Sequence, residues 1–486
     1  MRGEVPRQAA LPERPEHWVS PGDAAYDETR AVWNGLHDRR PAHIARCRTA
    51  AEVSQALRYA AAAGLDVTVR GGGHHVAGSA VADGTLMVDV SPMRAVTVDV
   101  HARVAVAEGG CRLRDLDTVT APYGLACPTG TVADTGLGGL ALGGGYGWLA
   151  RRWGLTCDHI LAAQVVLADG SIIDATEHSH PELLWALRGG GGTFGVVTRF
   201  TLRLRPVGQV LYGAGVHALD DAPDALAAYR AYTGRQPVDL HTVARLGHAG
   251  DQPWVPEHLR GGPVLLLLAV WSGDPEDGPA QAASLFDEIR PAAQVARAMP
   301  YPHLQALGDD TRPKGHRYST SAAYLDDLPG DAVRQLVEAA RENPSPRCSI
   351  DLEYLRGAIA DVPEQDSAFP GRAAPYQLTV SAHWTDPGQD AEHLAWSRAT
   401  ADRTRPFGTG GGYLNHAERG AGRSAREHYG PDRYARLAAV KKAYDPTNLL
   451  RGTVDIRPEG DHGQGLVGAR AGAPGGNPGE RAARPG

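Results

Sequence analysis

A run of three glycines followed by two histidines is the part of this sequence best suited to chemistry. It reads Val69-Arg70-Gly71-Gly72-Gly73-His74-His75-Val76-Ala77-Gly78. Glycine allows turns that other residues avoid, so successive backbone N–H groups can converge on an anion. His74 follows at once, within reach of a phosphate-bearing cofactor. The spacing predicts a dinucleotide held by the backbone and touched or bonded by the imidazole; the alternative is a glycine-rich turn with two incidental histidines.

Two further glycine clusters lie downstream, at 136–147 and at 188–195. A G-x-G-x-x-G match can be forced in the first cluster. That fingerprint should follow a strand and open a helix, however, and residues 128–131 are predicted to be a loop. The sequence contains no GxxxxGK[ST] motif, which excludes a P-loop nucleotide triphosphatase. The glycine clusters therefore match neither standard nucleotide-binding motif well.

A metal site is not predicted. Adjacent histidines such as His74 and His75 seldom point at one ion, and no HExxH pattern accompanies them. The cysteines form no CxxC pair, which argues against a zinc site or a disulfide framework and fits a reducing compartment. The five cysteines are Cys47, Cys111, Cys127, Cys157 and Cys348.

The first glycine turn is expected to follow directly on a helix and a strand. Thr49 and Glu52 have the spacing of a capping box, the Ala-rich run to Ala63 is predicted to be helical, and Gly64 suits its end. Residues 65–70 are then predicted to be a strand, so the turn lies at a strand end, where ligand loops belong. Further strands are expected at 86–90, 96–107 and 196–204, with a hairpin over 162–173.

The pattern changes beyond Pro206. Strands at 264–271 and 376–384 mix with Ala-rich helices, which is typical of an α+β domain with an antiparallel sheet. The expected helices cover 222–232, 278–289, 330–342 and, after a Gly/Tyr/Asn-rich return segment, 434–444. The chain beyond about Pro458 has almost no apolar residues and is predicted to be disordered.

Composition and charge narrow the class of protein. The 486 residues suffice for two or three domains, and 42% hydrophobic with 22% charged residues is ordinary for a globular protein. The net charge of −7 leaves no basic excess for binding nucleic acid. The longest apolar run, 264–271, is too short to span a membrane. Residues 1–20 lack the apolar core of a signal peptide, so a cytoplasmic location is predicted.

Taken together, these motifs resemble the berberine-bridge-enzyme-like flavin oxidases, within the vanillyl-alcohol-oxidase (PCMH-type FAD-binding) superfamily. Arg70–His74 resembles the family's pyrophosphate loop, and 135–147 resembles its second flavin loop. The segments 154–158 and 188–197 follow in the family's order. Tyr413-Leu414-Asn415, 429–434 and 444–448 resemble the closing motif, so the match runs from about Pro21 to Arg451.

The resemblance implies an α+β fold with a two-part PCMH-type FAD-binding domain. Residues 20–206 and 408–456 would form that domain, and residues 207–407 would form an α+β substrate domain whose antiparallel sheet covers the flavin. Residues 457–486 would be a disordered tail.

The resemblance also implies how FAD is held. Its 8α-methyl group would be bonded to His74, which raises the flavin's reduction potential; alternatively, His74 only packs beside a non-covalent flavin. The implied cofactor contacts are Arg70, Gly71, Gly72, Gly73, His74, His75, Gly78, Thr131, Val132, Thr135, Gly136, Gly138, Gly139, Gly143, Tyr146, Gly147, Asp158, Gly195, Val197, Tyr413 and Asn415.

Some members of the family carry a second flavin link from a cysteine in C-x-x-x-G-x-G-G. When Gly136 is aligned with that pattern, Val132 stands at the cysteine position and Cys127 lies five residues earlier. One covalent link is therefore predicted, with Cys127 as a loop or core residue. A rearranged loop in which Cys127 bonds the flavin stays open.

Tyr146, Tyr413 and His416 are the expected catalytic residues. The resemblance places Tyr146 and Tyr413 near the reacting end of the flavin, and His416 stands close by where the family usually has an aromatic residue, either as a general base or as a supporting polar residue. A tyrosine base needs a lowered pKa, whereas a neutral imidazole accepts a proton near pH 7. The substrate-facing strand is expected at 376–384, but alternation does not choose between its two faces. Asp351, Glu353 and Tyr354 on the preceding segment are weaker candidates. For the two acidic residues a solvated face is the simpler interpretation.

The function implied is that of an FAD-dependent oxidase, with bacterial secondary metabolism as its expected setting. A base would remove a proton from an alcohol, sugar or natural-product intermediate, hydride would pass to the covalently bound flavin, and O2 would reoxidise it to give H2O2. The partners would be the small substrate and O2, with no nucleic acid and no membrane. The alternative is a non-redox cyclase that keeps the fold and the FAD; peroxide release distinguishes the two.

Overall fold

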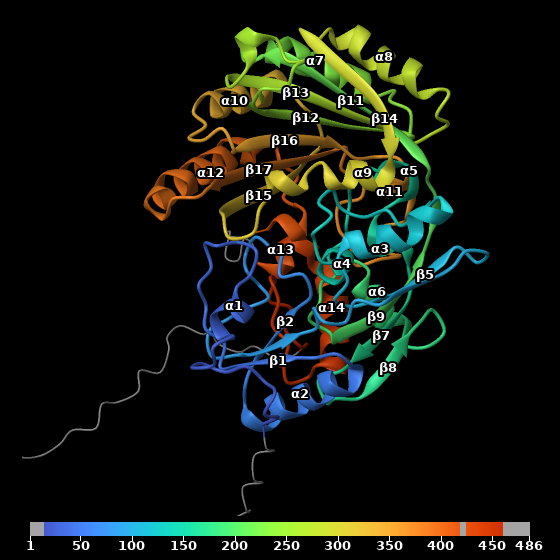
Figure 1. Cartoon of the computed structure of the whole chain (residues 1–486), viewed down its shortest axis with the longest axis vertical. Coiled ribbons are helices and arrows are strands. Elements are labelled where there is room, and N and C mark those ends of the chain that lie inside the picture. Colours follow the sequence, from blue (N-terminus) through green and yellow to red (C-terminus); the bar gives the residue numbers. More distant parts are fainter. Residues whose placement is uncertain (1–13, 418–423, 460–486) are drawn as a thin grey trace, which may run out of the picture.

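The computed structural model describes residues 14–417 and 424–459, which form two parts stacked along the long axis (Figure 1). The lower part in Figure 1 contains the chain up to Pro206 together with the C-terminal helices. The upper part is built on one large sheet. Helices combined with mainly antiparallel sheets confirm the predicted α+β fold class. Residues 460–486 of the predicted tail lie outside the described residues.

A small parallel sheet carries the first glycine turn. Its strands lie in the order β1 (His43–Arg46), β3 (Leu86–Asp89), β2 (Val67–Arg70), and the turn follows β2. α2 (Ala50–Ala63) confirms the helix predicted before it: the Glu52 N–H donates to Thr49 Oγ1 at 3.2 Å, and Gly64 ends the helix at φ 66°. The parallel pairing was not predicted, because alternation within a strand carries no information on direction.

An antiparallel five-stranded sheet lies beside it. Its order is β4 (Val96–Asp99), β5 (Val104–Glu108), β9 (Val196–Arg203), β7 (Ile160–Val166), β8 (Ile172–Ala175). The predicted hairpin is β7–β8, and the predicted strand region 96–107 forms two strands joined at a turn where Arg103 has φ 53°. A two-stranded pair, β6 (Leu125–Ala126) with β10 (Arg205–Pro206), closes this part.

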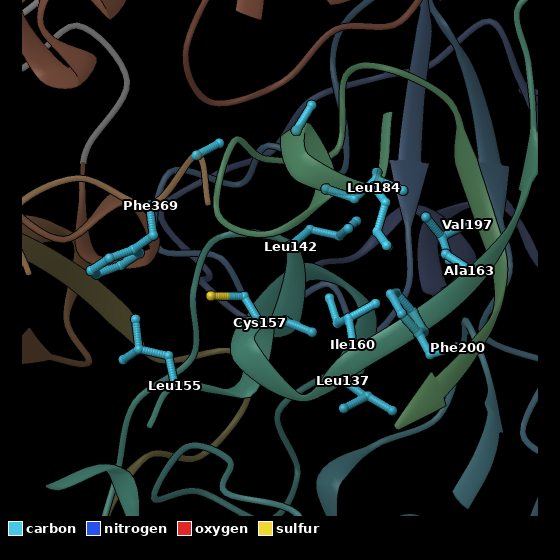
Figure 2. Close-up of a cluster of buried hydrophobic side chains, with 14 of the residues drawn as sticks. Leu137, Leu142, Leu155, Cys157, Ile160, Ala163, Leu184, Val197, Phe200 and Phe369 are labelled. Atoms are coloured by element: carbon cyan, nitrogen blue, oxygen red, sulfur yellow. The ribbon is translucent and has the colours of Figure 1, made fainter. Parts of the chain in front are cut away.

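Short helices pack against the five-stranded sheet around a buried core. Figure 2 shows Leu137, Leu142, Ile160 and Phe200 within that cluster. The helices of this part are α1 (Tyr26–Arg30), α3 (Leu113–Thr120), η1 (Ala121–Tyr123), α4 (Leu137–Leu142), α5 (Ala150–Trp153), η2 (Thr156–His159) and α6 (Pro181–Leu187). α4 was not predicted, because its sequence LGGLAL contains two glycines, which disfavour helix.

A seven-stranded antiparallel sheet forms the upper part. Its order is β14 (Ala293–Pro300), β11 (Gln209–Ala218), β13 (Pro263–Trp271), β12 (Leu240–His248), β16 (Ser349–Tyr354), β17 (Tyr376–Trp384), β15 (Arg317–Leu325). All seven strands fall within 207–407. The apolar faces of α7 (Ala222–Thr233), α8 (Gly278–Ile289), α10 (Gly330–Arg341) and α12 (Asp390–Thr404) cover one side of this sheet (Figure 1).

The remaining short elements connect these layers. They are η3 (Leu219–Asp221), η4 (Glu257–Leu259), α9 (Tyr301–Ala306), η5 (Asp309–Thr311), α11 (Ala358–Asp361), η6 (Pro387–Gln389), η7 (Arg405–Phe407), η8 (Leu414–His416) and α13 (Ala425–Tyr429). Among the described residues, no helix has the length and apolar character needed to cross a membrane.

The C-terminal segment returns to the lower part and is fastened there by a buried ion pair. α14 (Pro431–Tyr444) packs on α6, and Leu450 bridges to Val67 of β2. Lys441 Nζ donates to Asp445 Oδ2 at 2.6 Å, to the Thr193 carbonyl at 2.7 Å and to the Leu450 carbonyl at 3.1 Å. Both charged side chains are 0% exposed. The ammonium therefore ties α14 and the segment just after it to Thr193, which lies 248 residues away in the sequence.

Removal of the ammonium should destabilise the fold strongly. In Lys441→Met the Asp445 carboxylate stays buried without its partner, and we expect a loss of about 3–5 kcal/mol in the free energy of unfolding. Urea unfolding followed by circular dichroism measures it. The matched control is Lys442→Met on the same helix, where the lysine side chain is 59% exposed and its partner Glu459 is 4.0 Å away; this variant should lose no more than about 1 kcal/mol. Equal losses in both variants would contradict the assignment.

Candidate functional site

One cavity of about 490 Å³ runs between the two parts of the molecule. The glycine loops of the lower part line one side of it, and the seven-stranded sheet lines the other. Most of the cofactor contacts implied by the sequence lie on its wall. These are Gly71, Gly72, Gly73, His74, His75, Thr131, Val132, Thr135, Gly136, Gly138, Gly139, Gly143, Tyr146, Gly195, Val197, Tyr413 and Asn415.

The first glycine turn presents unpaired donors to this cavity. Within the described residues, the backbone N–H groups of Gly72, Gly73 and His74 have no hydrogen-bond acceptor. Gly73 has φ 64°, a conformation that lets successive N–H groups point to one side. Such an arrangement suits the oxygens of a pyrophosphate.

The first and second glycine loops touch back to back. A Cβ added to Gly72 would lie 2.5 Å from the Gly136 nitrogen, and one added to Gly136 would lie 2.3 Å from the Gly72 nitrogen. No side chain fits at either position, so both residues must be glycine for the loops to meet. At Gly139, by contrast, an added Cβ would meet nothing within 4 Å and would extend into open space.

The third glycine cluster and the C-terminal segment complete the cavity wall on the side of the glycine loops. Gly190–Thr193 and Arg451–Val454 line it. The Thr193 hydroxyl and the Arg451 Nε are buried without a protein hydrogen-bond partner. Buried polar groups are normally hydrogen-bonded, so these two atoms indicate a polar ligand. Unpaired donors, close glycine backbones and open space together fit a dinucleotide such as FAD.

His74 is held on the cavity wall by aromatic stacking. Its ring stacks on Trp33 at 4.3 Å between centroids, and Trp33 stacks on Tyr318 at 3.8 Å. Burial lowers the pKa of His74 to about 4. The imidazole is therefore neutral at physiological pH and keeps a nucleophilic lone pair.

His75 has a different role. Its Nδ1 accepts the N–H of Ala77 at 3.1 Å, and its Nε2 lies 3.3 Å from the Leu414 carbonyl. These contacts tie the first glycine turn to η8. The described residues contain no group of three or more metal-binding side chains.

Four of the cofactor contacts implied by the sequence do not line the cavity. The Arg70 guanidinium donates to the Thr29 carbonyl and lies 3.9 Å from Asp89. Asp158 pairs with Arg372 at 2.5 Å instead. Gly78 and Gly147 allow close packing: a Cβ on Gly78 would meet the His37 ring at 2.6 Å, and one on Gly147 would meet the Thr129 carbonyl oxygen at 2.4 Å. Local motif spacing cannot distinguish a ligand contact from a residue that supports the loop.

Cys127 also lies away from the cavity. It is fully buried, and its thiol is 3.7 Å from the Pro128 carbonyl. Burial raises the pKa of the Cys127 thiol far above its ordinary value. Val132, the residue aligned with the family's cysteine, lines the cavity.

The three expected catalytic side chains converge on one region of the cavity. The rings of Tyr146 and Tyr413 are 4.4 Å apart, those of Tyr413 and His416 are 5.0 Å apart, and those of Tyr146 and His416 are 6.1 Å apart. Tyr146 comes from the second glycine loop, and the other two lie at or just before η8, which returns from the far end of the chain.

Hydrogen bonds orient the members of this group. Tyr413 Oη accepts the Gly145 N–H at 3.0 Å and the Asn415 amide N–H at 2.8 Å. Burial nevertheless raises the pKa of Tyr413 above its ordinary value. His416 Nδ1 lies 3.2 Å from Thr379 Oγ1, and burial lowers the pKa of His416 to about 4. The Tyr146 hydroxyl faces Thr379 and Glu353 without a well-formed hydrogen bond to either, so it can bind a ligand.

The seven-stranded sheet supplies charged residues to the cavity wall. Glu353 and Asp351 on β16 and Arg245 on β12 line the cavity. Arg245 binds Asp351 through Nε at 2.5 Å and Nη2 at 3.3 Å. Glu353 Oε2 is buried without a partner. Burial raises the pKa of Glu353 to about 8, the charge of Asp351 acts in the same direction, and Arg245 opposes both.

The sheet also decides which face of β17 meets the cavity. Thr379 and Ser381 line it, whereas Leu378 and Val380 pack in the core beneath the helices. Trp148, Tyr212, Val243 and Leu268 add an apolar patch on the same side. The alternation at 376–384 identified these two sets. Only the packing of α12 on β17 shows which set faces the helices and which set faces the cavity.

Comparisons with known proteins agree with this geometry. Residues 41–176 match the family described as FAD binding domain, and residues 412–456 match the family described as berberine and berberine-like. An FAD-linked oxidoreductase of Dictyostelium discoideum is 30% identical over 431 residues, which cover 88% of this chain and 91% of that protein.

Solved structures share the fold. The 6-hydroxy-D-nicotine oxidase of Arthrobacter nicotinovorans superposes with a TM-score of 0.80 at 26% identity, covering 93% of this chain and 100% of that one. The glucooligosaccharide oxidase of Acremonium strictum, which carries a 6-S-cysteinyl, 8α-N1-histidyl FAD, has a TM-score of 0.79 at 21% identity, covering 91% and 97%. This chain belongs to the berberine-bridge-enzyme-like family of FAD-dependent oxidoreductases.

Proposed function

We propose that this oxidase acts on a small organic molecule, with FAD bonded to His74 and O2 as the final electron acceptor. The observation that carries the proposal is that Tyr146, Tyr413 and His416 converge on the cavity that the glycine loops and His74 also line. When bound, FAD supplies an acceptor for one hydride, which carries two electrons. The protein's task is to hold the substrate, exclude water and accept a proton.

The single covalent link is supported by the surroundings of His74. A neutral imidazole is the nucleophilic form, and burial keeps His74 neutral. The stacked rings of Trp33 and Tyr318 restrict its plane. The glucooligosaccharide oxidase has a cysteinyl link as well. We propose no such link here, because Val132 lies on the cavity wall and Cys127 does not.

Glu353 is the side chain best matched to accept the substrate proton. A general base works best when its pKa lies near the working pH. The pKa of Glu353 is about 8, whereas that of His416 is about 4 and that of Tyr413 is above its ordinary value. We propose that Glu353 is the base and that Tyr146, Tyr413 and His416 contact the reacting group and orient it.

Histidyl attachment can be tested on the purified holoenzyme. His74→Ala should still fold and bind FAD through backbone contacts, but acid precipitation should release the flavin into the supernatant. In the parent protein the flavin should stay in the pellet. Cys127→Ser is the control and should keep the flavin in the pellet. A flavin-bearing peptide that contains Cys127, found by peptide mapping, would overturn the single link.

Screening alcohols, amines and sugars for peroxide release should provide a substrate. With that substrate, Glu353→Gln should lower the rate of flavin reduction by about 10²–10⁴-fold, because the general base is lost. Stopped-flow bleaching of the flavin under anaerobic conditions measures this rate. The same measurement on Tyr413→Phe, Tyr146→Phe and His416→Ala compares how much each of these side chains contributes to it. Tyr376→Phe is a matched control, since its hydroxyl binds Thr233 away from the cavity. If all four cavity variants reduce the flavin at the rate of the parent protein, the assignment of these residues to the reaction is wrong.

The pH dependence gives an independent check. A carboxyl group is a base only when deprotonated, and the pKa of Glu353 is raised to about 8. The rate of flavin reduction should therefore rise as the pH increases through about 8 and then level off. Glu353→Gln should remove that step. A step that persists unchanged in Glu353→Gln would show that another group titrates.

A further inference from the structure

Arg312 brings a second guanidinium to the substrate side of the cavity. It follows η5 and precedes β15, is half-buried, and lines the cavity. Its backbone carbonyl accepts the indole N–H of Trp33 at 2.8 Å, which fixes the loop beside the stacked rings. This contact fixes the backbone from which the Arg312 side chain extends.

The Arg312 guanidinium has no acidic partner in the described residues. No carboxylate lies within 4.0 Å of it, and it donates no hydrogen bond to a protein acceptor. The nearby carboxylate of Asp351 is already occupied, because both of its oxygens bind Arg245 and one also accepts the Ser349 hydroxyl at 3.2 Å. A guanidinium stays charged at physiological pH, so one without an acidic protein partner is available to pair with an anionic ligand.

The charges on this side of the cavity do not cancel. Arg245 and Asp351 neutralise each other. Glu353 is mostly uncharged at pH 7, and His416 is neutral. Arg312 therefore leaves an excess of one positive charge. The charges of Arg245 and Asp351 on the sheet act on Arg312, and Arg312 in turn acts on His416 and on His74.

The surroundings of that charge are apolar. Trp148, Tyr212, Val243 and Leu268 line the same side of the cavity. A ligand that fits both features has a hydrophobic or aromatic body and one anionic group. A planar carboxylate matches the geometry of the guanidinium, with two parallel N–H···O bonds available.

We propose that the substrate is a carboxylic acid with an apolar body, and that Arg312 binds its carboxylate. This inference rests on the proposed function, because it places the substrate on the sheet side of the flavin cavity. Arg312 is then a specificity-determining residue, while Glu353 and the tyrosines act at the reacting end.

Binding of inert probes to the holoenzyme tests the proposal without turnover. Benzoate, cinnamate and 2-naphthoate, each beside its neutral amide, are titrated while the flavin absorbance spectrum is recorded. At least one acid should bind about 10- to 100-fold more tightly than its amide, the range expected for a charged hydrogen bond. Arg312→Met should bring that ratio close to one and leave the affinity for the amide unchanged. Arg312→Lys should keep part of the preference.

Lys314→Met is the matched control. It removes the same charge two residues away, from an exposed side chain that does not line the cavity, and it should keep the parent ratio. Three results would overturn the proposal: no acid preferred over its amide in the parent protein, a preference that survives in Arg312→Met, or loss of FAD from Arg312→Met. If the parent protein prefers acids over amides but releases no peroxide with any substrate, only the proposed oxidase function is refuted.

Discussion

The buried ion pair between Lys441 and Asp445 is the interaction on which the cavity depends. Its ammonium also donates to the carbonyls of Thr193 and Leu450. One charge therefore joins α14, the third glycine cluster and the segment that follows α14 and bridges to β2. Asp445 further accepts the N–H groups of Leu449 and Leu450 at 2.8 and 2.9 Å. A charge removed from water must have all its partners in place. The segment that closes the cofactor side is therefore held in one position.

Burial determines the chemistry of the cavity more than any individual contact does. It lowers the pKa of His74 and His416 and raises that of Glu353 and Tyr413. Every one of these shifts favours the uncharged form, because a low-dielectric site disfavours charge. The result at neutral pH is a cavity that contains both a nucleophilic imidazole and a carboxyl group whose pKa is close to the working pH. The Arg245–Asp351 pair and Arg312 keep their charges on the sheet side.

Much of the fold followed from local sequence. α8 and β17 have the predicted bounds, and α14 begins three residues before its predicted start because Pro431 is tolerated in the first helical turn. Amphipathic periodicity and caps are local properties, so they are readable from neighbouring residues. Strand direction and the short helix α4 were not readable, since they depend on what packs against them.

The sequence by itself determined the glycine loops and His74, because backbone conformation and residue type are set locally. It also named Tyr146, Tyr413 and His416, through motifs that lie far apart along the chain. Only the tertiary structure decided that these three side chains meet and that Thr379 faces the cavity. It also places Glu353 and Arg312, but not Arg70 and Asp158, on the cavity wall. The physical reason is that burial and pairing of charge depend on neighbours supplied by other segments, and no local pattern records them.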